Sequence, residues 1–262
     1  MTSRSYVLAE TTWSTVRDAK YEVAVLPWGA TEAHNYHLPY ATDTIQCDYI
    51  AAESVRKAVE RGARIVALPT VPFGVQTGQL DIPLCLNMNP STQAALLRDL
   101  AECVAGQGIG KLVIMNGHGG NDFRQMIPEL QPRVGLFHCQ VNWYQVVDPA
   151  PYFAPGDHAG EMETSVMLHA SPELVLPLAQ AGDGAARRPV IPGLREGWAW
   201  TPRPWTRISA DTGVGDPRAA TAEKGKRYAE MVTDRVGEFL AQLAAIDPGE
   251  LFGNELDATT RS

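Results

Sequence analysis

Two imidazoles and two carboxylates that suit a divalent metal ion lie together in the stretch from Glu32 to Asp43. Glu32 and His34 are two residues apart, so in an extended segment both side chains leave the same face. His37 supplies the second imidazole. Neutral imidazole and carboxylate oxygen are the donors that divalent transition-metal ions bind in proteins. This stretch therefore predicts a metal site, and the alternative is a polar surface loop with incidental histidines.

A second histidine motif, Asn116-Gly-His118-Gly-Gly-Asn121, follows a separate apolar run. Glycines let the backbone turn sharply and approach a ligand closely. We expect His118 to point over the same sheet edge as Glu32 and His34. A phosphate-binding turn is the alternative, but the spacings GxGxxG and GxxxxGK[ST] are both absent here.

A third polar group runs from Asp157 to Glu163. Asp157 is a suitable N-cap for a following helix, and acidic residues in a first turn suit the helix dipole. That structural interpretation does not account for His158, which would be a suitable proton shuttle beside a metal ion. His138 and His169 lie among apolar neighbours, and we interpret them as structural.

The rest of the chain predicts the elements that must position these groups. Apolar runs at 22–27, 64–69, 111–115 and 135–143 alternate with helical patterns at 46–60, 90–105, 122–130 and 219–244. The first three runs are continuously apolar, which suits strands buried on both faces of a parallel sheet. We therefore predict one three-layer αβα domain over residues 1–262, with a mostly parallel central sheet. Ligands bind at the carboxyl edge of such sheets, where the first two motifs lie.

Segment 181–217 differs from its surroundings. It is rich in Gly, Pro and Arg, and it contains Trp198, Trp200 and Trp205. A stretch this long without helical or strand periodicity is uncommon inside a compact domain. We predict a loop insertion that serves as a lid or a subunit contact.

Composition narrows the class of protein. The chain has 262 residues, of which 45% are hydrophobic and 20% charged, with a net charge of −8. An acidic globular protein is not expected to bind nucleic acid or an anionic membrane. We see no signal peptide and no run near the roughly 18 apolar residues of a membrane span. The four cysteines are scattered and form no CxxC pair, which favours reduced thiols in the cytoplasm.

Together the three motifs resemble the creatininase (creatinine amidohydrolase) family, from about Leu26 to the Gly213-Val-Gly-Asp-Pro segment. The resemblance implies a three-layer αβα fold and a homo-oligomer, often a hexamer. Family members hydrolyse C–N bonds of cyclic or linear amides with zinc, manganese or iron. It therefore also implies a small-molecule substrate and one or two divalent ions per chain.

The resemblance also assigns residues by position. Glu32 and His118 would bind one ion, and His34 would bind the other. Asp43 would bridge the two ions. His158 matches the catalytic histidine of the family.

This chain departs from creatininase itself in the second motif, in the turn after the first histidine, and in its tryptophans, of which only Trp143 is a candidate match to one in the creatininase active site. Where creatininase has a glutamate that completes the second metal site, this chain has Gly120. Either Glu163 replaces that ligand, or the second ion is weak or absent. Asn35-Tyr36 stand where creatininase has Gly-Pro, so we expect a family member other than true creatininase.

The predicted reaction is attack of metal-activated water on the carbonyl of a small cyclic or linear amide. Glu163, when it is not a full ligand, would accept the proton of the water, and His158 would protonate the leaving group. The alternative is hydrolytic C–C cleavage that opens an oxidised cyclitol or a similar cyclic ketone. The residues expected to contact substrate are Asn35, Tyr36, His37, Gly119, Gly120 and Asn121.

Overall fold

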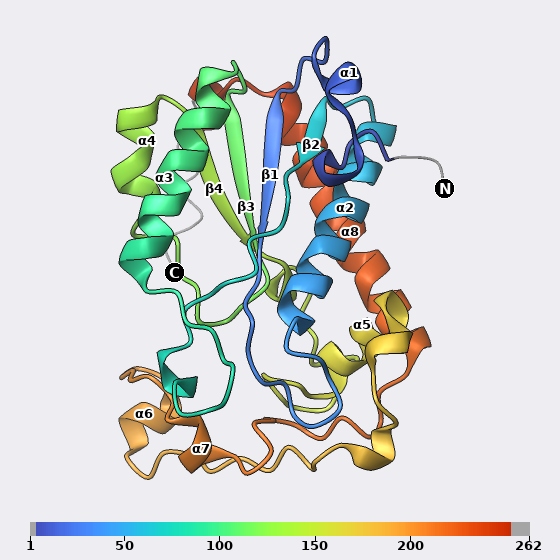
Figure 1. Cartoon of the computed structure of the whole chain (residues 1–262), viewed down its shortest axis with the longest axis vertical. Helices are drawn as coiled ribbons and strands as arrows, with labels where there is room; N and C mark the ends of the chain where they lie inside the picture. Colours follow the sequence, from blue (N-terminus) through green and yellow to red (C-terminus); the bar gives the residue numbers. More distant parts are fainter. Residues whose placement is uncertain (1–3, 253–262) are drawn as a thin grey trace, which may run out of the picture.

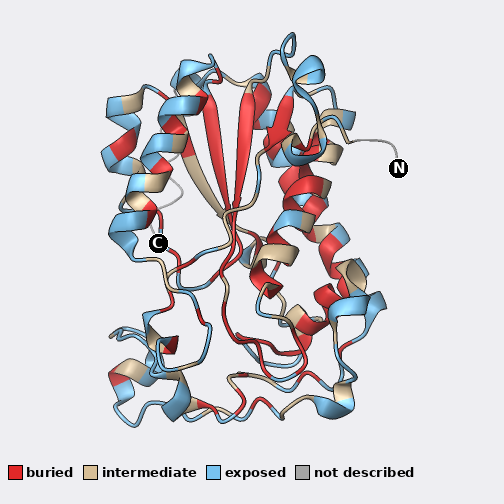
Figure 2. Ribbon diagram, in the orientation of Figure 1, coloured by how far each residue is buried: buried red, intermediate tan, exposed pale blue. Residues whose placement is uncertain are grey.

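A four-stranded sheet forms the centre of the computed structural model, which describes residues 4–252 (Figure 1). All strand pairs are parallel, in the order β2–β1–β3–β4, which confirms the predicted parallel sheet. The strands are β1 (Val23–Trp28), β2 (Ile65–Ala67), β3 (Lys111–Asn116) and β4 (Phe137–Asn142). Every residue of β1 and β3 is buried, as their continuous apolar runs predict (Figure 2).

Helices cover both faces of the sheet, so the three-layer prediction is also confirmed (Figure 1). One layer consists of α3 (Pro90–Gly106) and α4 (Ile127–Val134), and the other contains α2 (Thr42–Glu60), α5 (Glu161–Ala170) and α8 (Ala222–Ala245). Successive strand residues point to opposite faces. Ala24 and Leu26 therefore pack in the core beside α3 and α4, while Val23 and Val25 pack beside α2 and α8.

Three predicted helix starts are wrong, and one of them belongs to the helix predicted at 219–244, which begins at Ala222. The helix predicted at 46–60 begins at Thr42, because the polar residues of its first turn conceal its apolar pattern. The helix predicted at 122–130 begins only at Ile127. Asp122 accepts a hydrogen bond from the backbone of Arg124, which forms a turn instead, and Pro128 suits the start of the following helix.

The remaining helices are short and lie near the ends of the longer elements. They are α1 (Trp13–Val16), α6 (Pro192–Glu196) and α7 (Trp205–Ile208), with single 3₁₀ turns at Leu8–Glu10, Thr77–Gln79, Trp143–Gln145, Pro172–Leu174, Leu178–Gln180 and Pro248–Glu250. Among the described residues, no helix combines the length and the apolar character needed to cross a bilayer.

Segment 181–217 is largely irregular, with α6 and α7 as its two helices. It runs past the ends of the strands at which the arrows point, at the bottom of Figure 1. Hydrogen bonds tie it to the loop after β1, where Asn35 and Gly182 exchange a pair of bonds. The predicted single domain spans 1–262, of which residues 1–3 and 253–262 lie outside the described part.

Candidate metal centre

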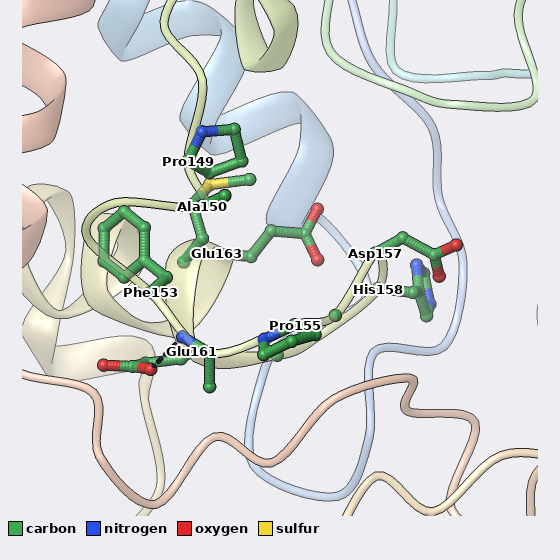
Figure 3. A pocket seen from close by; sticks show the side chains of 12 residues that line it. Pro149, Ala150, Phe153, Pro155, Asp157, His158, Glu161 and Glu163 are labelled. Atoms are coloured by element: carbon green, nitrogen blue, oxygen red, sulfur yellow. Dashed lines mark hydrogen bonds between the residues drawn. The ribbon is translucent and has the colours of Figure 1, made fainter.

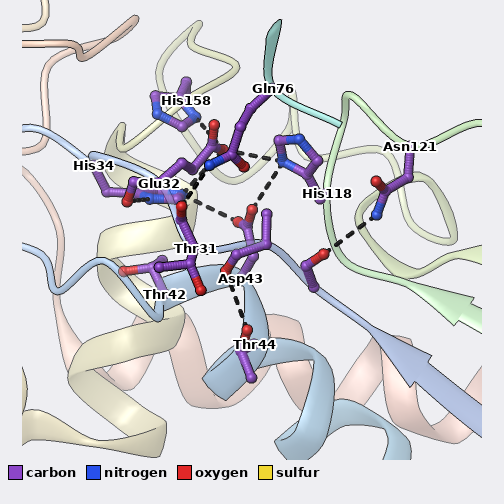
Figure 4. Close-up of polar contacts among 12 residues, drawn as sticks. Thr31, Glu32, His34, Thr42, Asp43, Thr44, Gln76, His118, Asn121 and His158 are labelled. Carbon is purple, nitrogen blue, oxygen red and sulfur yellow. Dashed lines mark hydrogen bonds and ion pairs between the residues drawn. The ribbon is translucent and has the colours of Figure 1, made fainter. Parts of the chain in front are cut away.

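Six ionisable side chains from four segments meet beyond the carboxyl ends of β1 and β3 (Figures 3 and 4). The loop after β1 supplies two, the first turn of α2 one, the turn after β3 one, and the start of α5 the last two. In that order they are Glu32 and His34, Asp43, His118, and His158 with Glu163. These are the six residues that the sequence predicts as ligands or proton carriers.

The loop between β1 and α2 is folded tightly enough to bring Asp43 close to Glu32. Gly29 permits this, since a Cβ there would lie 2.6 Å from the backbone nitrogen of Thr44. The Thr44 hydroxyl in turn donates a hydrogen bond of 3.1 Å to the carbonyl of Ala30 (Figure 4). The start of α2 is thereby attached to the end of β1.

His118 is oriented by a backbone carbonyl. Its Nε2 donates to the carbonyl oxygen of Val75 at 2.9 Å. Its Nδ1 faces two carboxylate oxygens, at 3.0 Å from Glu32 Oε1 and 2.9 Å from Asp43 Oδ2 (Figure 4). A neutral imidazole held in this way directs a lone pair at two acceptors, and a cation between them would relieve that repulsion.

His34 is held in the same way, beside the carboxylates of Asp43 and Glu163. Its Nδ1 donates to the carbonyl oxygen of Glu32 at 3.2 Å, and its Nε2 lies 3.0 Å from Asp43 Oδ1. Glu163 completes this group, and one of its oxygens accepts a hydrogen bond of 2.5 Å from the Ala159 backbone. Asp43 therefore belongs to both groups, with a different oxygen near each imidazole.

His158 is the third imidazole fixed by a carbonyl. Its Nε2 donates to the Ala33 carbonyl oxygen at 2.8 Å, and its Nδ1 lies 3.8 Å from Glu32 Oε1. Its ring packs on that of His34, with 4.3 Å between centroids. The predicted capping role of Asp157 is wrong, because Gly160 is the N-cap of α5 and Asp157 instead pairs with Arg203.

The buried carboxylates alter the protonation of their neighbours. Burial alone would lower the pKa of His34, but the Asp43 carboxylate outweighs it and raises that pKa to about 10. Burial would by itself raise the pKa of Asp43, yet His34 and then His118 hold it well below its ordinary value. Burial also raises the pKa of Glu163. Three carboxylates buried this closely require positive charge among them, as protons or as metal ions.

Three groups in this cluster could each hold a divalent ion, and within each the potential ligand atoms lie within 4.8 Å of one another. Two of them share Asp43, and they are Glu32 with Asp43 and His118, and His34 with Asp43 and Glu163. The third is Glu32 with His34 and His158. Mixed imidazole and carboxylate donors suit zinc, manganese or iron. The donor set, its burial and the orientation of the imidazoles therefore fit metal binding.

A cavity of about 260 Å³ borders the cluster, with His158 and Glu163 in its wall (Figure 3). Its other walls are mainly apolar and include Pro149, Phe153 and Met162. A small organic group would have room there beside the two predicted catalytic side chains.

Comparison with known proteins agrees with this geometry. Residues 9–240 match the model of the family Creatininase, described as creatinine amidohydrolase. The chain belongs to the creatininase family. A Mycofactocin precursor peptide peptidase from Mycobacterium tuberculosis is 31% identical over 237 residues, which cover 83% of this chain and 86% of that relative. The family and the named relatives identify the chain as a hydrolase.

Solved structures confirm the creatininase fold. A candidate creatinine amidohydrolase from Bacteroides fragilis is 43% identical, with a TM-score of 0.89 over 93% of this chain and 98% of the other. A structure described as creatininase with Mn is 22% identical, with a TM-score of 0.73 over 93% of this chain and 100% of the other. The lower identity to creatininase itself agrees with the prediction of a family member other than true creatininase.

The glutamate expected of creatininase itself at this position would not fit at Gly120. A Cβ at Gly120 would lie 2.0 Å from the Val75 carbonyl oxygen and 2.5 Å from His118 Nε2. The segment that fixes His118 therefore occupies the space of that side chain. Gly119 has nothing within 4 Å of its Cβ position, so of these two adjacent glycines only Gly119 faces open space.

Four of the predicted substrate contacts use their side-chain polar atoms within the protein. The amide of Asn121 bonds to Asn116 Oδ1, Gly29 and Val75, and that of Asn35 bonds to Gly182. His37 Nε2 shares a hydrogen bond with a threonine hydroxyl. The Tyr36 hydroxyl donates a hydrogen bond of 3.0 Å to the Ala210 carbonyl, although Tyr36 is 59% exposed. A role for these residues in substrate binding stays a prediction.

Sequence reasoning missed one side chain at the centre, Gln79, and did not distinguish a second, Trp205, from its neighbours in the predicted lid. Gln79 donates a hydrogen bond to Glu32, and the ring of Trp205 packs on His158. Gln79 lies in the loop that follows β2, and this loop had to reach the same sheet edge as the metal motifs. That position is a usable signal, but nothing in the sequence singles out Trp205 from the other tryptophans of its segment.

Proposed function

We propose that this creatininase-family hydrolase binds two divalent metal ions and hydrolyses an amide bond. One ion would be held by Glu32, Asp43 and His118. The other would be held by His34, Asp43 and Glu163, with Asp43 as the bridge. The observation that carries the proposal is the shared orientation of the imidazoles, each donating to a backbone carbonyl and turning its other nitrogen to carboxylates.

Zinc and manganese are the proposed ions, and iron is a further candidate. The mixed nitrogen and oxygen donors support this choice. A related creatininase structure described with Mn supports it as well. A bound ion of this kind lowers the pKa of water from about 15.7 towards 7 and polarises a carbonyl.

His158 would carry the proton in this reaction. Its Nε2 is committed to the Ala33 carbonyl, which leaves Nδ1 to exchange a proton with the departing nitrogen. Glu163 would act first as a metal ligand through Oε1, because its Oε2 accepts a hydrogen bond from the Ala159 backbone. Its predicted second role, as acceptor of the proton from water, needs Glu163 free of the ion.

An amide or peptide bond is the proposed target. One relative is named a peptidase and the family is described as an amidohydrolase, and both names denote cleavage of C–N bonds. No finding supports the alternative of C–C ring opening. The mainly apolar cavity beside His158 and Glu163 favours an amide that carries a small apolar group. We also propose that the chain acts in the cytoplasm as a homo-oligomer, and light scattering would test for a hexamer.

The metal count per chain tests the proposal. Elemental analysis of protein purified without chelator should give near two ions for the parent, about one for Glu163→Gln and almost none for Asp43→Ala. Glu173→Gln is the matched control, since Glu173 is an exposed carboxylate of a 3₁₀ turn outside the cluster. A parent that holds no zinc, manganese or iron after reconstitution would remove the basis of the proposal.

A further inference from the structure

The imidazole of His158 packs against two other rings. One is that of His34, with 4.3 Å between centroids and 33° between planes. Trp205 also packs on the imidazole, with 4.5 Å between centroids and 52° between planes. The hydrogen bond from Nε2 to Ala33 fixes one point of the ring, and the packed rings restrict its rotation about that bond.

Trp205 reaches the centre from segment 181–217, and its neighbours in that segment anchor it. The Arg203 guanidinium donates two hydrogen bonds to the carboxylate of Asp157, which directly precedes His158 in the chain. The same guanidinium lies 5.6 Å from the centroid of the Trp205 ring. The ion pair thus joins the segment that carries the indole to the segment that carries the imidazole.

The loop after β2 holds the other side of α7. Thr206 Oγ1 donates a hydrogen bond of 2.5 Å to Asp81. A Cβ at Gly78 would lie 1.9 Å from the carbonyl oxygen of Arg203, so only glycine permits this approach. The contrast within the segment is sharp, because Trp198 and Trp200 are 78% and 84% exposed. Of the three tryptophans of this segment, only Trp205 packs on a ring of the centre.

We propose that Trp205 is a positioning residue for His158 and covers the metal centre, with the Arg203–Asp157 pair as its latch. The indole holds the imidazole with Nδ1 directed at Glu32 and keeps solvent from one of its faces. This inference rests on the proposed function for its catalytic meaning. The cover itself is a property of the folded chain and can be tested without a substrate.

Labelling of His158 with diethyl pyrocarbonate tests the cover on the metal-loaded protein. The rate of modification is followed by mass spectrometry of the peptide that contains His158. Trp205→Ala should raise this rate several-fold, Trp205→Phe should restore it close to the parent value, and Trp200→Ala should leave it unchanged. Asp157→Asn, which removes the latch at a half-exposed position, should give an intermediate rise.

A rate in Trp205→Ala equal to that of the parent, or an equal rise in Trp200→Ala, would overturn the inference. Metal content and melting temperature at parent values would show that each variant is folded. Asp157→Asn decides the question if Trp205→Ala does not fold. The outcome is separate from that of the proposed function, because a parent that cleaves no amide probe can still show the protection of His158.

A kinetic measurement extends the test to catalysis, with L-alanine p-nitroanilide as the probe. A positioning role predicts that Trp205→Ala lowers kcat with little change in KM, and that Trp205→Phe recovers most of kcat. A rise in KM alone would assign Trp205 to substrate binding and contradict the positioning role.

Discussion

The side-chain amide of Gln79 donates a hydrogen bond of 2.5 Å to Oε2 of Glu32, and both side chains are buried. This bond leaves Oε1 of Glu32 to face the three imidazoles. Gln79 is itself held, since its Oε1 accepts hydrogen bonds from the Ala33 backbone and from the Cys85 thiol. The orientation of one proposed ligand therefore depends on a residue of the loop after β2.

We expect Gln79→Ala to weaken metal binding. Loss of a partner that orients a metal ligand typically costs about 10- to 100-fold in affinity. Competition against a chelating dye would measure the zinc affinity of the parent and the variant. Gln180→Ala, at an exposed position of a 3₁₀ turn, is the control and should bind zinc as the parent does. Equal affinities in all three proteins would show that Gln79 does not orient Glu32.

Substitution of two adjacent glycines by alanine should affect the stability of the protein differently. Gly120→Ala places a Cβ 2.0 Å from the Val75 carbonyl oxygen, so the backbone that orients His118 must shift. Overpacking of this kind typically costs about 1–3 kcal/mol of stability. Gly119→Ala meets nothing within 4 Å and should change stability by less than about 0.5 kcal/mol. Urea denaturation of both variants would check this, and equal stability would contradict the close approach at Gly120.

The proximity of the first two metal motifs could be predicted from the sequence. Glu32 and His118 follow two continuously apolar strands, and the carboxyl ends of parallel strands meet at one edge of the sheet. Their proximity therefore follows from strand periodicity alone. The role of Glu163 came from the family resemblance, and the structure adds that it lies with His34 and Asp43.

Other features of the centre could not be predicted, because they depend on tertiary packing. Gln79 and Trp205 act through contacts with chain distant in sequence, and no local pattern marks such contacts. The start of α4 was misplaced for a related reason. Phe123 packs against Trp28 in the core instead of continuing a helix, with 4.8 Å between ring centroids.

His158→Ala should impair turnover and leave the metal ions bound. Removal of a general acid–base group typically costs about 10²- to 10⁴-fold in rate. His158 lies outside the two ion-binding groups proposed above, although it forms a third candidate group with Glu32 and His34. Elemental analysis of the variant should match the parent, and a lost ion would make His158 a ligand. The rate would be followed with amide probes on which the parent is active. His169→Ala is the control, because His169 lies outside the metal centre and shares a hydrogen bond with the Tyr49 hydroxyl. Near-normal turnover in His158→Ala would remove His158 from the mechanism.

A histidine outside the centre predicts how stability depends on pH. His138 is 3% exposed, and burial lowers its pKa more than a backbone contact with Leu136 raises it. The fold therefore favours the neutral imidazole, while the unfolded chain takes up a proton near pH 6.5. The stability that this preference contributes is complete above about pH 6.5 and is lost as the pH falls towards the lower pKa of the folded state.

His138→Leu removes this titration and retains an apolar side chain at the site. Between pH 7.5 and 5.5 the parent should lose more free energy of unfolding than the variant, by up to about 1.4 kcal/mol. Urea denaturation of both proteins at both pH values gives this difference, and groups that titrate equally in the two proteins cancel from it. An equal loss in parent and variant would mean that His138 titrates in the folded protein as it does in the unfolded chain.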